Sequence, residues 1–480
     1  MIPRTMSTQH PDNVLTPFFA ESPVIKGDDE IKEAFYAFSH LNCQEQMWDY
    51  EGKEVDNFVV RKLLSRYGHF FRDVVLGRDV RLTLRVPNPS WERAEAKVLL
   101  ETLESIPRSF DVAKIFYGED FAPIFEVIFP MTTSHVELNR VYYYYKNFVV
   151  GKQNKSFFYG DITIAEWIGE FKPYEINVIP LIEDLPYILR CDEIVRSYLS
   201  DKFVEYQRVF LAKSDLAMNY GAVASTLALK IALVKLQELE EEISTPVYPI
   251  VGFGSAPFRG NLRPDNVDYI LKSWRGVQTF TIQSAFKYDY PEREVVKAID
   301  KINSSKRGKA EFQDFERALE IIKKTSEEYR GCIISLVPLI NEVAKHTPKR
   351  RERKLHIGLF GYSREINGKT LPRAIPLCCA LYSIGLPPDV LGLSCLNERE
   401  MEFVLEHCER DLKDALRFFN PRVLEIIPNS VAEKVRKTLD FLDFEIDENY
   451  KVLTDEVIDS LGNLNEEILT RCAYFRRFLG

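Results

Sequence analysis

The sequence predicts an α/β fold, a (β/α)8 TIM-type barrel with additional C-terminal and inserted α-helices. Eight short segments have the composition of β-strands, and most are followed by a longer segment with helical periodicity. Several of these strands are continuous apolar runs, which is typical of parallel strands that helices cover on both faces. Eight such units indicate a closed barrel, whose functional site lies at the carboxyl ends of the strands.

The predicted strands recur along the first three quarters of the chain. Segment 80–86 reads VRLTLRV, and its alternation of apolar and polar residues indicates a strand. Segment 176–182 reads INVIPLI and indicates a strand buried on both faces. In chain order the predicted strands cover 4–9, 80–86, 125–129, 176–182, 207–212, a segment that begins at Tyr248, 278–282 and 356–360.

Apolar residues at helical spacing predict helices between the strands. Within 28–40, for example, Ile31, Ala34, Phe35 and Phe38 fall on one helical face. The predicted helices cover 28–40, 57–76, 91–104, 136–148, 185–200, 221–242, 264–274, 290–302 and 310–345, the last with a break near Gly331. We expect one domain over 1–480, with a helical extension from about 365 to 480 that includes a hairpin near 450–453.

Composition excludes several classes of protein. The chain has 480 residues, 45% of them hydrophobic, which is enough for a large core. Its net charge of -9 gives no support to binding of nucleic acid or of a membrane surface. The eight cysteines form no CxxC pair, and no uncharged run reaches the ~20 residues of a membrane helix. The N-terminus has no apolar signal-peptide region, so we expect a cytoplasmic protein.

Functional residue types follow the predicted strands. Glu183 and Asp215 follow two successive strands, and two neighbouring carboxylates are suited to Mg2+ or Mn2+. Each could equally be a helix cap or a salt-bridge partner. His10 follows the first strand and is a candidate general base, although a lone histidine is often structural. Arg85 and Arg364 also follow strands, and arginine binds phosphate or carboxylate through paired donors.

Three other stretches carry charge or aromatic side chains. The loop after the strand from Tyr248 combines three glycines with Arg259 and Arg263, so it indicates a site for a small anion or an ordinary surface loop. Arg373 opens an apolar helix, where a cation is unfavourable unless an anion is near. The basic run 349–354 predicts a solvated face, and the tyrosines at 142–145 predict a contact between domains or subunits.

Three motifs resemble the archaeal-type phosphoenolpyruvate carboxylases. They are MSTQHPDN at the N-terminus, GFGSAPFRGNLRPDN from Gly252 and TFTIQSAFKYDYP from Thr279, and the resemblance extends over essentially the whole chain. The resemblance implies catalytic roles for His10 and Arg259 and metal binding by Glu183 and Asp215. It also implies that the substrate-binding residues are Arg85, Arg263, Gln283, Arg364 and Arg373.

The chain departs from the longer members of that family in its arginine loop. GSAPFRGNLR has fewer glycines than their loop, and we favour Arg259 over Arg263 on the bicarbonate side. The TIQ motif resembles the start of TVQGE in those proteins, but Ala285 replaces the glutamate.

The resemblance implies that the protein converts phosphoenolpyruvate and bicarbonate to oxaloacetate and phosphate. The reaction runs through carboxyphosphate and a metal-bound pyruvate enolate, with Mg2+ or Mn2+, and replenishes four-carbon acids. A homotetramer is implied as well. Two alternatives remain open at this point. One is another metal-dependent barrel lyase or aldolase that acts through an enolate, and the other is a protein that binds phosphoenolpyruvate without turnover.

Overall fold

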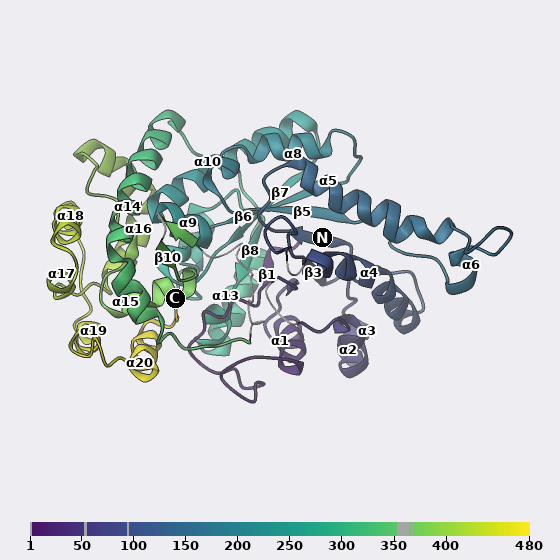
Figure 1. The fold of residues 1–480 in the computed structure, drawn as a ribbon, viewed down its shortest axis with the longest axis horizontal. Helices are drawn as coiled ribbons and strands as arrows, with labels where there is room; N and C mark the ends of the chain where they lie inside the picture. The colour runs from purple at the N-terminus through teal and green to yellow at the C-terminus, as the bar shows by residue number, and fades with distance from the viewer. Residues whose placement is uncertain (1, 52–54, 94–95, 353–363, 367–368) are drawn as a thin grey trace.

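A closed barrel of eight parallel strands forms the centre of the computed structural model, which describes residues 2–51, 55–93, 96–352, 364–366 and 369–480 (Figure 1). Each strand pairs with the next along the chain, and β1 also pairs with β8, which closes the ring. The strands are β1 (Thr5–Ser7), β2 (Glu45–Asp49), β3 (Arg81–Arg85), β4 (Glu126–Phe129), β5 (Asn177–Ile182), β6 (Gln207–Ala212), β7 (Val247–Gly252) and β8 (Thr279–Ile282). The predicted barrel class is therefore confirmed.

The eighth barrel strand is not the one that the sequence predicted. β2 was missed because three of its five residues are polar, and such a segment does not resemble a core strand. All five residues are nevertheless buried: Glu45 accepts from Arg208 inside the barrel at 2.8 Å, and Gln46, on the opposite face of the strand, donates to the Met47 carbonyl at 2.8 Å. The predicted strand 356–360 lies outside the described residues, and the barrel closes without it.

The barrel interior has two packed layers below the site. At the amino ends of the strands, Arg208 donates to Glu45 at 2.6 Å and to Glu126 at 2.9 Å, and both acids are fully buried. Arg81 also pairs with Glu126. Above this charged layer is an apolar layer of eight side chains, contributed by six of the strands. Over the described residues, these two layers of side chains fill the barrel below the carboxyl ends of its strands.

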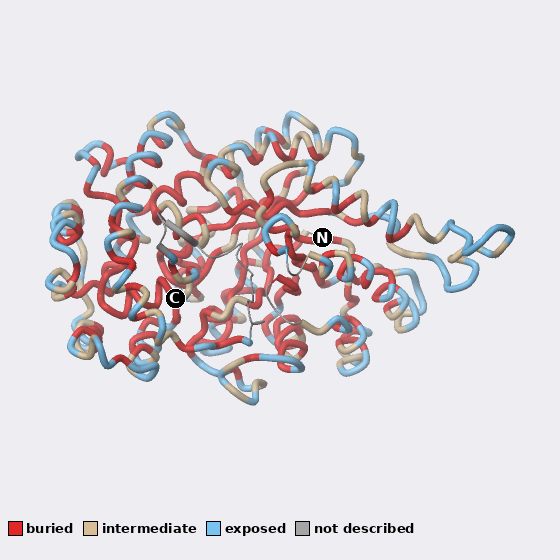
Figure 2. Tube along the Cα trace, in the orientation of Figure 1, coloured by how far each residue is buried: buried red, intermediate tan, exposed pale blue. Residues whose placement is uncertain are grey.

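Helices surround the barrel on its outer face. Their amphipathic sequences bury one side against the strands, so the barrel is buried and the outer helical faces are exposed (Figure 2). They are α1 (Asp28–Ser39), α2 (Val59–Arg66), α3 (Gly68–Asp73), α4 (Ala96–Tyr117), α5 (His135–Tyr144), α7 (Leu185–Ile188), α8 (Cys191–Leu199), α9 (Ser214–Tyr220), α10 (Ala222–Ile243), α11 (Val267–Ser273), α12 (Ser284–Tyr288) and α13 (Glu292–Ser304).

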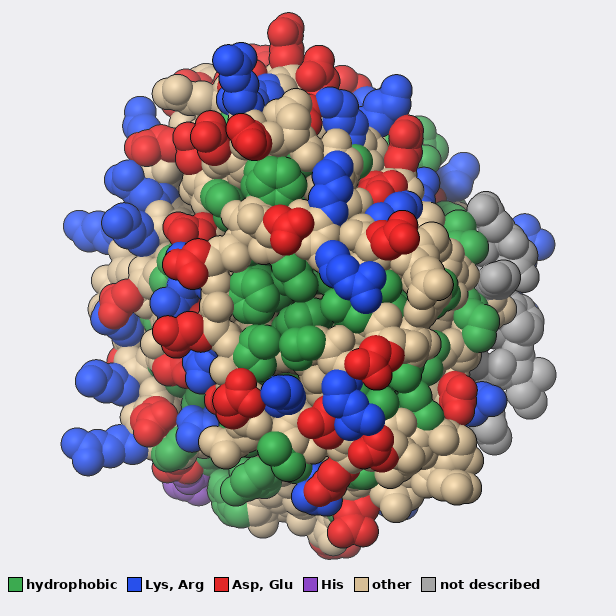
Figure 3. All heavy atoms as spheres, turned by 90° about the vertical axis from the view of Figure 1, so that its left-hand side faces the viewer, with side chains coloured by type: hydrophobic (Ala, Val, Ile, Leu, Met, Phe, Trp, Pro, Cys, Tyr) green, Lys and Arg blue, Asp and Glu red, His purple; other side chains and the backbone are tan. Residues whose placement is uncertain are grey.

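The C-terminal helices form an extension with its own apolar core, on the left of Figure 1. That core includes Ala217 of α9 and Ala222 of α10, so the extension packs directly on the barrel helices. Figure 3 shows this face of the molecule, where a central group of apolar side chains is ringed by acidic and basic ones. The elements are α14 (Phe315–Ala344), β9 (Arg364–Ile366), β10 (Lys369–Leu371), α15 (Ala374–Ser383), α16 (Glu398–Leu416), α17 (Val423–Ile426), α18 (Asn429–Leu439), α19 (Glu448–Asp459) and α20 (Glu466–Arg476).

Several local predictions need correction. The segments 57–76 and 185–200 each form two short helices, whereas α14 runs without a break at Gly331. The hairpin expected near 450–453 is wrong, because this segment lies inside helix α19. Among the tyrosines at 142–145, Tyr145 is buried and its hydroxyl donates to the Pro173 carbonyl at 2.8 Å, and the contact of this run with a domain or subunit stays a prediction. No described helix is long and apolar enough to cross a bilayer.

Candidate active site

A cavity of about 730 Å³ opens at the carboxyl ends of the barrel strands. The C-terminal extension forms its other wall, because Arg373 and Leu479 line it together with residues of the barrel. The structure brings together seven of the nine predicted site residues at this cavity, namely His10, Arg85, Glu183, Asp215, Arg259, Gln283 and Arg373. They come from the ends of separate strands and from helix α15, so only the closed barrel makes them neighbours.

Two carboxylates line the cavity side by side. Glu183 directly follows β5 and Asp215 lies in the first turn of α9, just after β6, and these two strands are paired. Glu183 is buried, and its Oε2 accepts from the Met131 amide at 2.7 Å. Burial, together with the charges of Asp215 and Glu51, raises the pKa of Glu183 to about 8. The repulsion from Asp215 and Glu51, which adds to burial in raising the pKa of Glu183, is what a bound cation relieves.

This donor set fits Mg2+ or Mn2+. Among the described residues, no three His, Cys, Asp or Glu side chains are grouped so that they could hold a metal ion. Mg2+ usually takes one or two carboxylates and completes its shell with water and substrate oxygens. The pair Glu183 and Asp215 therefore suits an ion that shares its coordination with a substrate.

His10 is held in place by a buried hydrogen-bond chain beneath it. Its Nδ1 lies 2.8 Å from Thr8 Oγ1, and the Thr8 carbonyl accepts from Lys287 Nζ at 3.0 Å. Lys287 in turn donates to Glu33 at 3.0 Å, and Glu33 pairs with Arg351 at 2.7 Å. Thr8, Lys287, Glu33 and Arg351 are all buried, so the ring of His10 rests on a rigid support.

Arg259 is the most constrained of the predicted residues. It lies in the loop after β7 and is 1% exposed, and its guanidinium donates to Gln283 Oε1 at 2.6 Å and to Ser214 Oγ at 3.1 Å. It also pairs with Asp12 at 3.2 Å and donates to the Gly480 carbonyl. Arg259 therefore joins the ends of β1, β6 and β8 and the end of the chain at one point beside the cavity.

Arg85 is paired with carboxylates that the sequence analysis missed. Its guanidinium makes two 2.7 Å hydrogen bonds to Asp49 and lies 3.1 Å from Glu51, which itself lines the cavity. Burial and the nearby Glu51 raise the pKa of Glu92 to about 8. Asp49 is the last residue of β2 and Glu51 lies two positions after it. Both were missed because this strand was not predicted. The signal available was the pair of predicted helices over 28–40 and 57–76 with no strand between them, because a (β/α)8 barrel places a strand between successive helices.

The segment that follows α14 forms part of the cavity wall, which was not expected from the sequence. The basic run at 349–354 was expected on a solvated face, but Arg350 and Arg351 are buried and line the cavity. Arg351 pairs with Glu30 at 2.8 Å, which ties this segment to α1. Arg373 directly precedes α15, as predicted, and also lines the cavity.

Two predicted residues are not placed at the cavity. Arg263 points away from it and pairs with Asp414 of α16 at 2.9 Å, so in this structure it holds the loop after β7 against the extension. The position of Arg364 begins β9, but its side chain lies outside the described residues.

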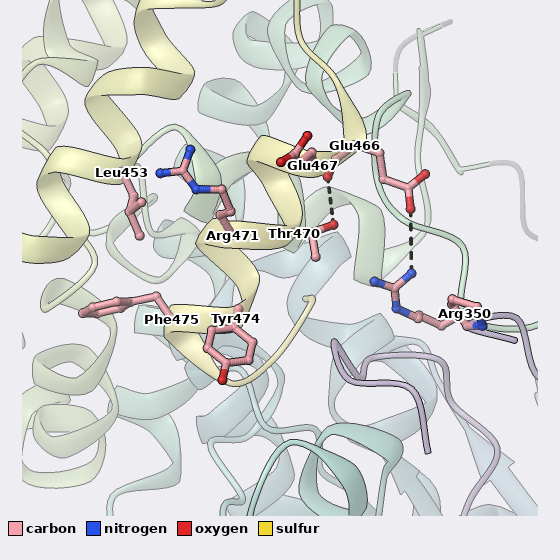
Figure 4. Close-up of a pocket in the computed structure, with 9 residues that line it drawn as sticks. Arg350, Leu453, Glu466, Glu467, Thr470, Arg471, Tyr474 and Phe475 are labelled. Carbon is pink, nitrogen blue, oxygen red and sulfur yellow. Dashed lines mark hydrogen bonds and ion pairs between the residues drawn. The ribbon is translucent and has the colours of Figure 1, made fainter. Parts of the chain in front are cut away.

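A second cavity of about 740 Å³ lies on the extension, beside α20 (Figure 4). Leu453, Tyr474 and Phe475 give it apolar walls. Its charged residues pair locally: Arg350 lies 3.8 Å from Glu466, as the dashed line in Figure 4 marks, and Arg471 pairs with Glu456 on α19. This cavity shares Arg350 with the first one but does not bring together the carboxylates and histidine found there.

Comparison with known proteins agrees with the motifs. The phosphoenolpyruvate carboxylase family model matches residues 2–480. A phosphoenolpyruvate carboxylase of Methanothermobacter thermautotrophicus is 54% identical over the whole of both chains, and one of Methanospirillum hungatei is 52% identical over the whole of both. Among solved structures, an HpcH/HpaI aldolase from Desulfitobacterium hafniense aligns at 14% identity and a TM-score of 0.35, covering 63% of this chain and 94% of its own. A likeness this low carries no argument about chemistry.

Proposed function

Because the chain belongs to the phosphoenolpyruvate carboxylase family, we propose that it carboxylates phosphoenolpyruvate with bicarbonate to give oxaloacetate and phosphate. One structural observation supports this proposal independently of the family membership. His10, Glu183, Asp215 and Arg373 line a single cavity at the carboxyl ends of the strands, where barrel enzymes carry their sites. This set contains the base, the carboxylates and the anion-binding group that the reaction needs.

The first step is attack of a bicarbonate oxygen on phosphorus, which releases the enolate of pyruvate and forms carboxyphosphate. Arg373 lines the cavity at the start of α15, and its guanidinium suits the phosphate face. Arg85 shares its charge with Asp49 and Glu51, which reduces the net charge that it offers to an anion. Arg259, fixed by four partners, is placed on the bicarbonate side as a preorganised donor.

Glu183 and Asp215 would hold Mg2+ or Mn2+. When bound there, the ion supplies positive charge that stabilises negative charge developing on substrate oxygens. The two side chains come from paired strands, so the barrel itself fixes their spacing.

His10 is the proposed base of the second step. It accepts the proton of carboxyphosphate, which then loses phosphate and gives CO2 next to the enolate. The enolate carbon attacks CO2 and the new carbon–carbon bond completes oxaloacetate. Thr8 and the buried chain beneath it hold the ring toward the cavity that His10 lines. Water must be excluded at this stage, because a proton on the enolate gives pyruvate instead.

A coupled assay tests the reaction. Oxaloacetate formation is followed through malate dehydrogenase, with and without added bicarbonate, in buffers freed of dissolved CO2. We expect turnover that depends strictly on both substrates and on a divalent cation. Carbon–carbon bond cleavage or formation independent of bicarbonate would favour a lyase or aldolase of the same barrel class. Saturable binding of phosphoenolpyruvate with no phosphate release would indicate a binding protein instead.

A further inference from the structure

The segment that follows α14 brings a group of basic side chains to the cavity. Four basic residues within 345–351 line the cavity, namely Lys345, Lys349, Arg350 and Arg351. The backbone of this segment is fixed, because the Ile25 amide donates to the Arg350 carbonyl at 3.0 Å and the Glu352 amide donates to the Ile25 carbonyl at 3.1 Å. The basic side chains are therefore attached to an ordered part of the cavity wall.

The four basic residues differ in their surroundings. Arg350 and Arg351 are buried, and Arg351 pairs with Glu33 at 2.7 Å. Lys345 and Lys349 are exposed, and neither ammonium group forms an ion pair with a described acid. Since both lysines also line the cavity, their charges lie where the cavity meets solvent, and they are available to a ligand that enters it.

The cavity is more basic than the chain as a whole. Eight basic and four acidic side chains line it, whereas the chain has a net charge of -9. Some of the basic groups have buried partners, since Arg85 pairs with Asp49 and Arg259 pairs with Asp12. At the exposed edge, Glu352 offsets one of the two lysine charges. The lysines thus leave an excess of positive charge at the opening, on a chain whose net charge repels anions.

Stabilisation of a helix end accounts for only one of the two lysines. Lys345 is the C-cap of α14, where a cation is favoured by the negative end of the helix dipole. Lys349 lies four positions farther along the chain, beyond the last turn in which this effect acts. What both lysines share is their place at the opening of the cavity. Lysine carries a compact, hydrated charge on a flexible stem, which suits brief attraction of an anion rather than fixed recognition.

Charge at the opening of a cavity acts on a ligand before the ligand reaches the residues inside. A cleft with an excess of one sign concentrates ligands of the opposite sign and raises their association rate by roughly 10–10³-fold. The substrate assigned to this cavity carries a phosphate and a carboxylate group, so both of its charged groups are attracted. Arg373, in the same cavity, offers the paired donors that suit the phosphate once it has entered.

We propose that Lys345 and Lys349 form an anion-capture site at the opening of the cavity, which concentrates phosphoenolpyruvate there before it binds to Arg373. The ligand class is a small anion that carries phosphate and carboxylate charges. The inference rests on the proposed function for the identity of this substrate, but its test measures binding and needs no turnover.

Calorimetric titration of the full chain with phosphoenolpyruvate, with Mg2+ present and bicarbonate absent, tests the site. The double variant Lys345→Gln, Lys349→Gln removes both charges from exposed side chains. At about 10 mM salt, where the Debye length is about 30 Å, its Kd should be about tenfold higher than that of the wild type. At about 1 M salt, where the Debye length is about 3 Å, the two Kd values should agree within about twofold. Lys345→Arg, Lys349→Arg keeps both charges and should keep the wild-type Kd.

The matched control is Lys297→Gln, Lys437→Gln, which removes two exposed lysines of α13 and α18 that do not line the cavity. It changes the net charge by the same amount and should keep the wild-type Kd. Equal Kd values for the wild type and the cavity glutamine variant at low salt would overturn the inference, as would an equal loss of affinity in the control or a loss that persists at high salt. A wild-type chain with no measurable affinity for phosphoenolpyruvate would overturn both the inference and the proposed function. If the wild type binds as expected but forms no oxaloacetate, only the proposed function fails.

Discussion

The two ends of the barrel differ in what surrounds their buried charged side chains. At the carboxyl ends, charged side chains such as Glu183 and Arg85 are buried around a cavity, each with named partners. At the amino ends, Arg208 and Glu126 fill the interior as a packed ion cluster, and the segment 145–175 outside the barrel exposes aromatic side chains such as Phe158 and Trp167. Charge buried around an open cavity is available to a ligand, whereas charge buried in a filled layer serves the fold. The comparison predicts that variants at the two ends fail in different assays.

The metal pair should give the largest effect on catalysis. Glu183→Gln and Asp215→Asn each remove a charged oxygen of the proposed metal site at nearly constant volume. Turnover should fall by roughly 10⁴-fold, because an ion held there would stabilise developing charge by several kcal/mol. Oxaloacetate formation across a titration of Mg2+ and Mn2+ measures this. Asp184→Asn is the matched control, because the neighbouring Asp184 accepts from Tyr220 and is not among the cavity-lining residues. Near-normal turnover of either cavity variant at ordinary metal concentration would remove that residue from the ligand set.

His10→Asn should come next in size and should separate the two chemical steps. Loss of a general base costs about 10²–10⁴-fold, so we expect oxaloacetate formation to fall about 10³-fold. Attack on phosphorus needs no base, so slow bicarbonate-dependent release of phosphate and pyruvate should survive. Coupling the products separately to malate and lactate dehydrogenases measures both. If both outputs disappear in a folded variant, the two-step role of His10 is wrong.

Variants in the charged layer at the amino ends of the strands should lower the stability of the fold rather than change the reaction. Arg208→Met leaves Glu45 and Glu126 buried without their shared partner. Breaking a buried ion pair from one side costs about 3–5 kcal/mol in the free energy of unfolding. Denaturant unfolding measures this loss, and the KM for phosphoenolpyruvate of the folded fraction should stay unchanged. A variant with wild-type stability would show that this ion cluster contributes nothing to the fold.

Arg373→Lys should have a smaller and more selective effect. Lysine keeps the positive charge but loses the paired donors that match a phosphate face. We expect the KM for phosphoenolpyruvate to rise about 10-fold, which corresponds to ~1.4 kcal/mol, with a smaller change in kcat. Arg350→Lys lies in the same cavity wall, but its Nε donates to the Val14 carbonyl, so it serves as the comparison. Equal KM values for wild type and Arg373→Lys would place Arg373 outside the phosphate site.

The smallest predicted effect tests whether Thr8 positions His10. Thr8→Val removes the hydroxyl that lies 2.8 Å from His10 Nδ1 and keeps the side-chain shape. A hydrogen bond of this kind contributes about 1 kcal/mol, so kcat should fall about fivefold. Thr8→Ser restores the hydroxyl and should recover most of the rate, and the pH profile of kcat/KM should shift only in the valine variant. If serine and valine behave alike, the role of Thr8 is packing.

Sequence patterns predicted the barrel and most of its site for an identifiable reason. A parallel strand buried on both faces is a continuous apolar run, and β5 and β6 were found for that reason. The residue after such a strand falls at the mouth of the barrel by topology alone, so Glu183 and Asp215 could be placed at the site from their positions in the chain. Strand β2 violated that rule, since Glu45 is buried in the charged layer inside the barrel, and Glu51 was missed with it.

The sequence by itself determined the fold class, the family and the residues at the strand ends, because each depends on local pattern and on motifs contiguous in the chain. The tertiary structure alone decided which charges are available. Arg263 and Arg259 stand four positions apart in one loop, yet Asp414 on α16 binds the first and the cavity wall holds the second. Arg350 and Arg351 are both buried, although their run looks like a solvated face. Glu30 and Glu33 of the distant helix α1 neutralise Arg351, and Arg350 donates to the Val14 carbonyl. The partner of a charged side chain comes from elsewhere in the chain, so the local sequence cannot specify it.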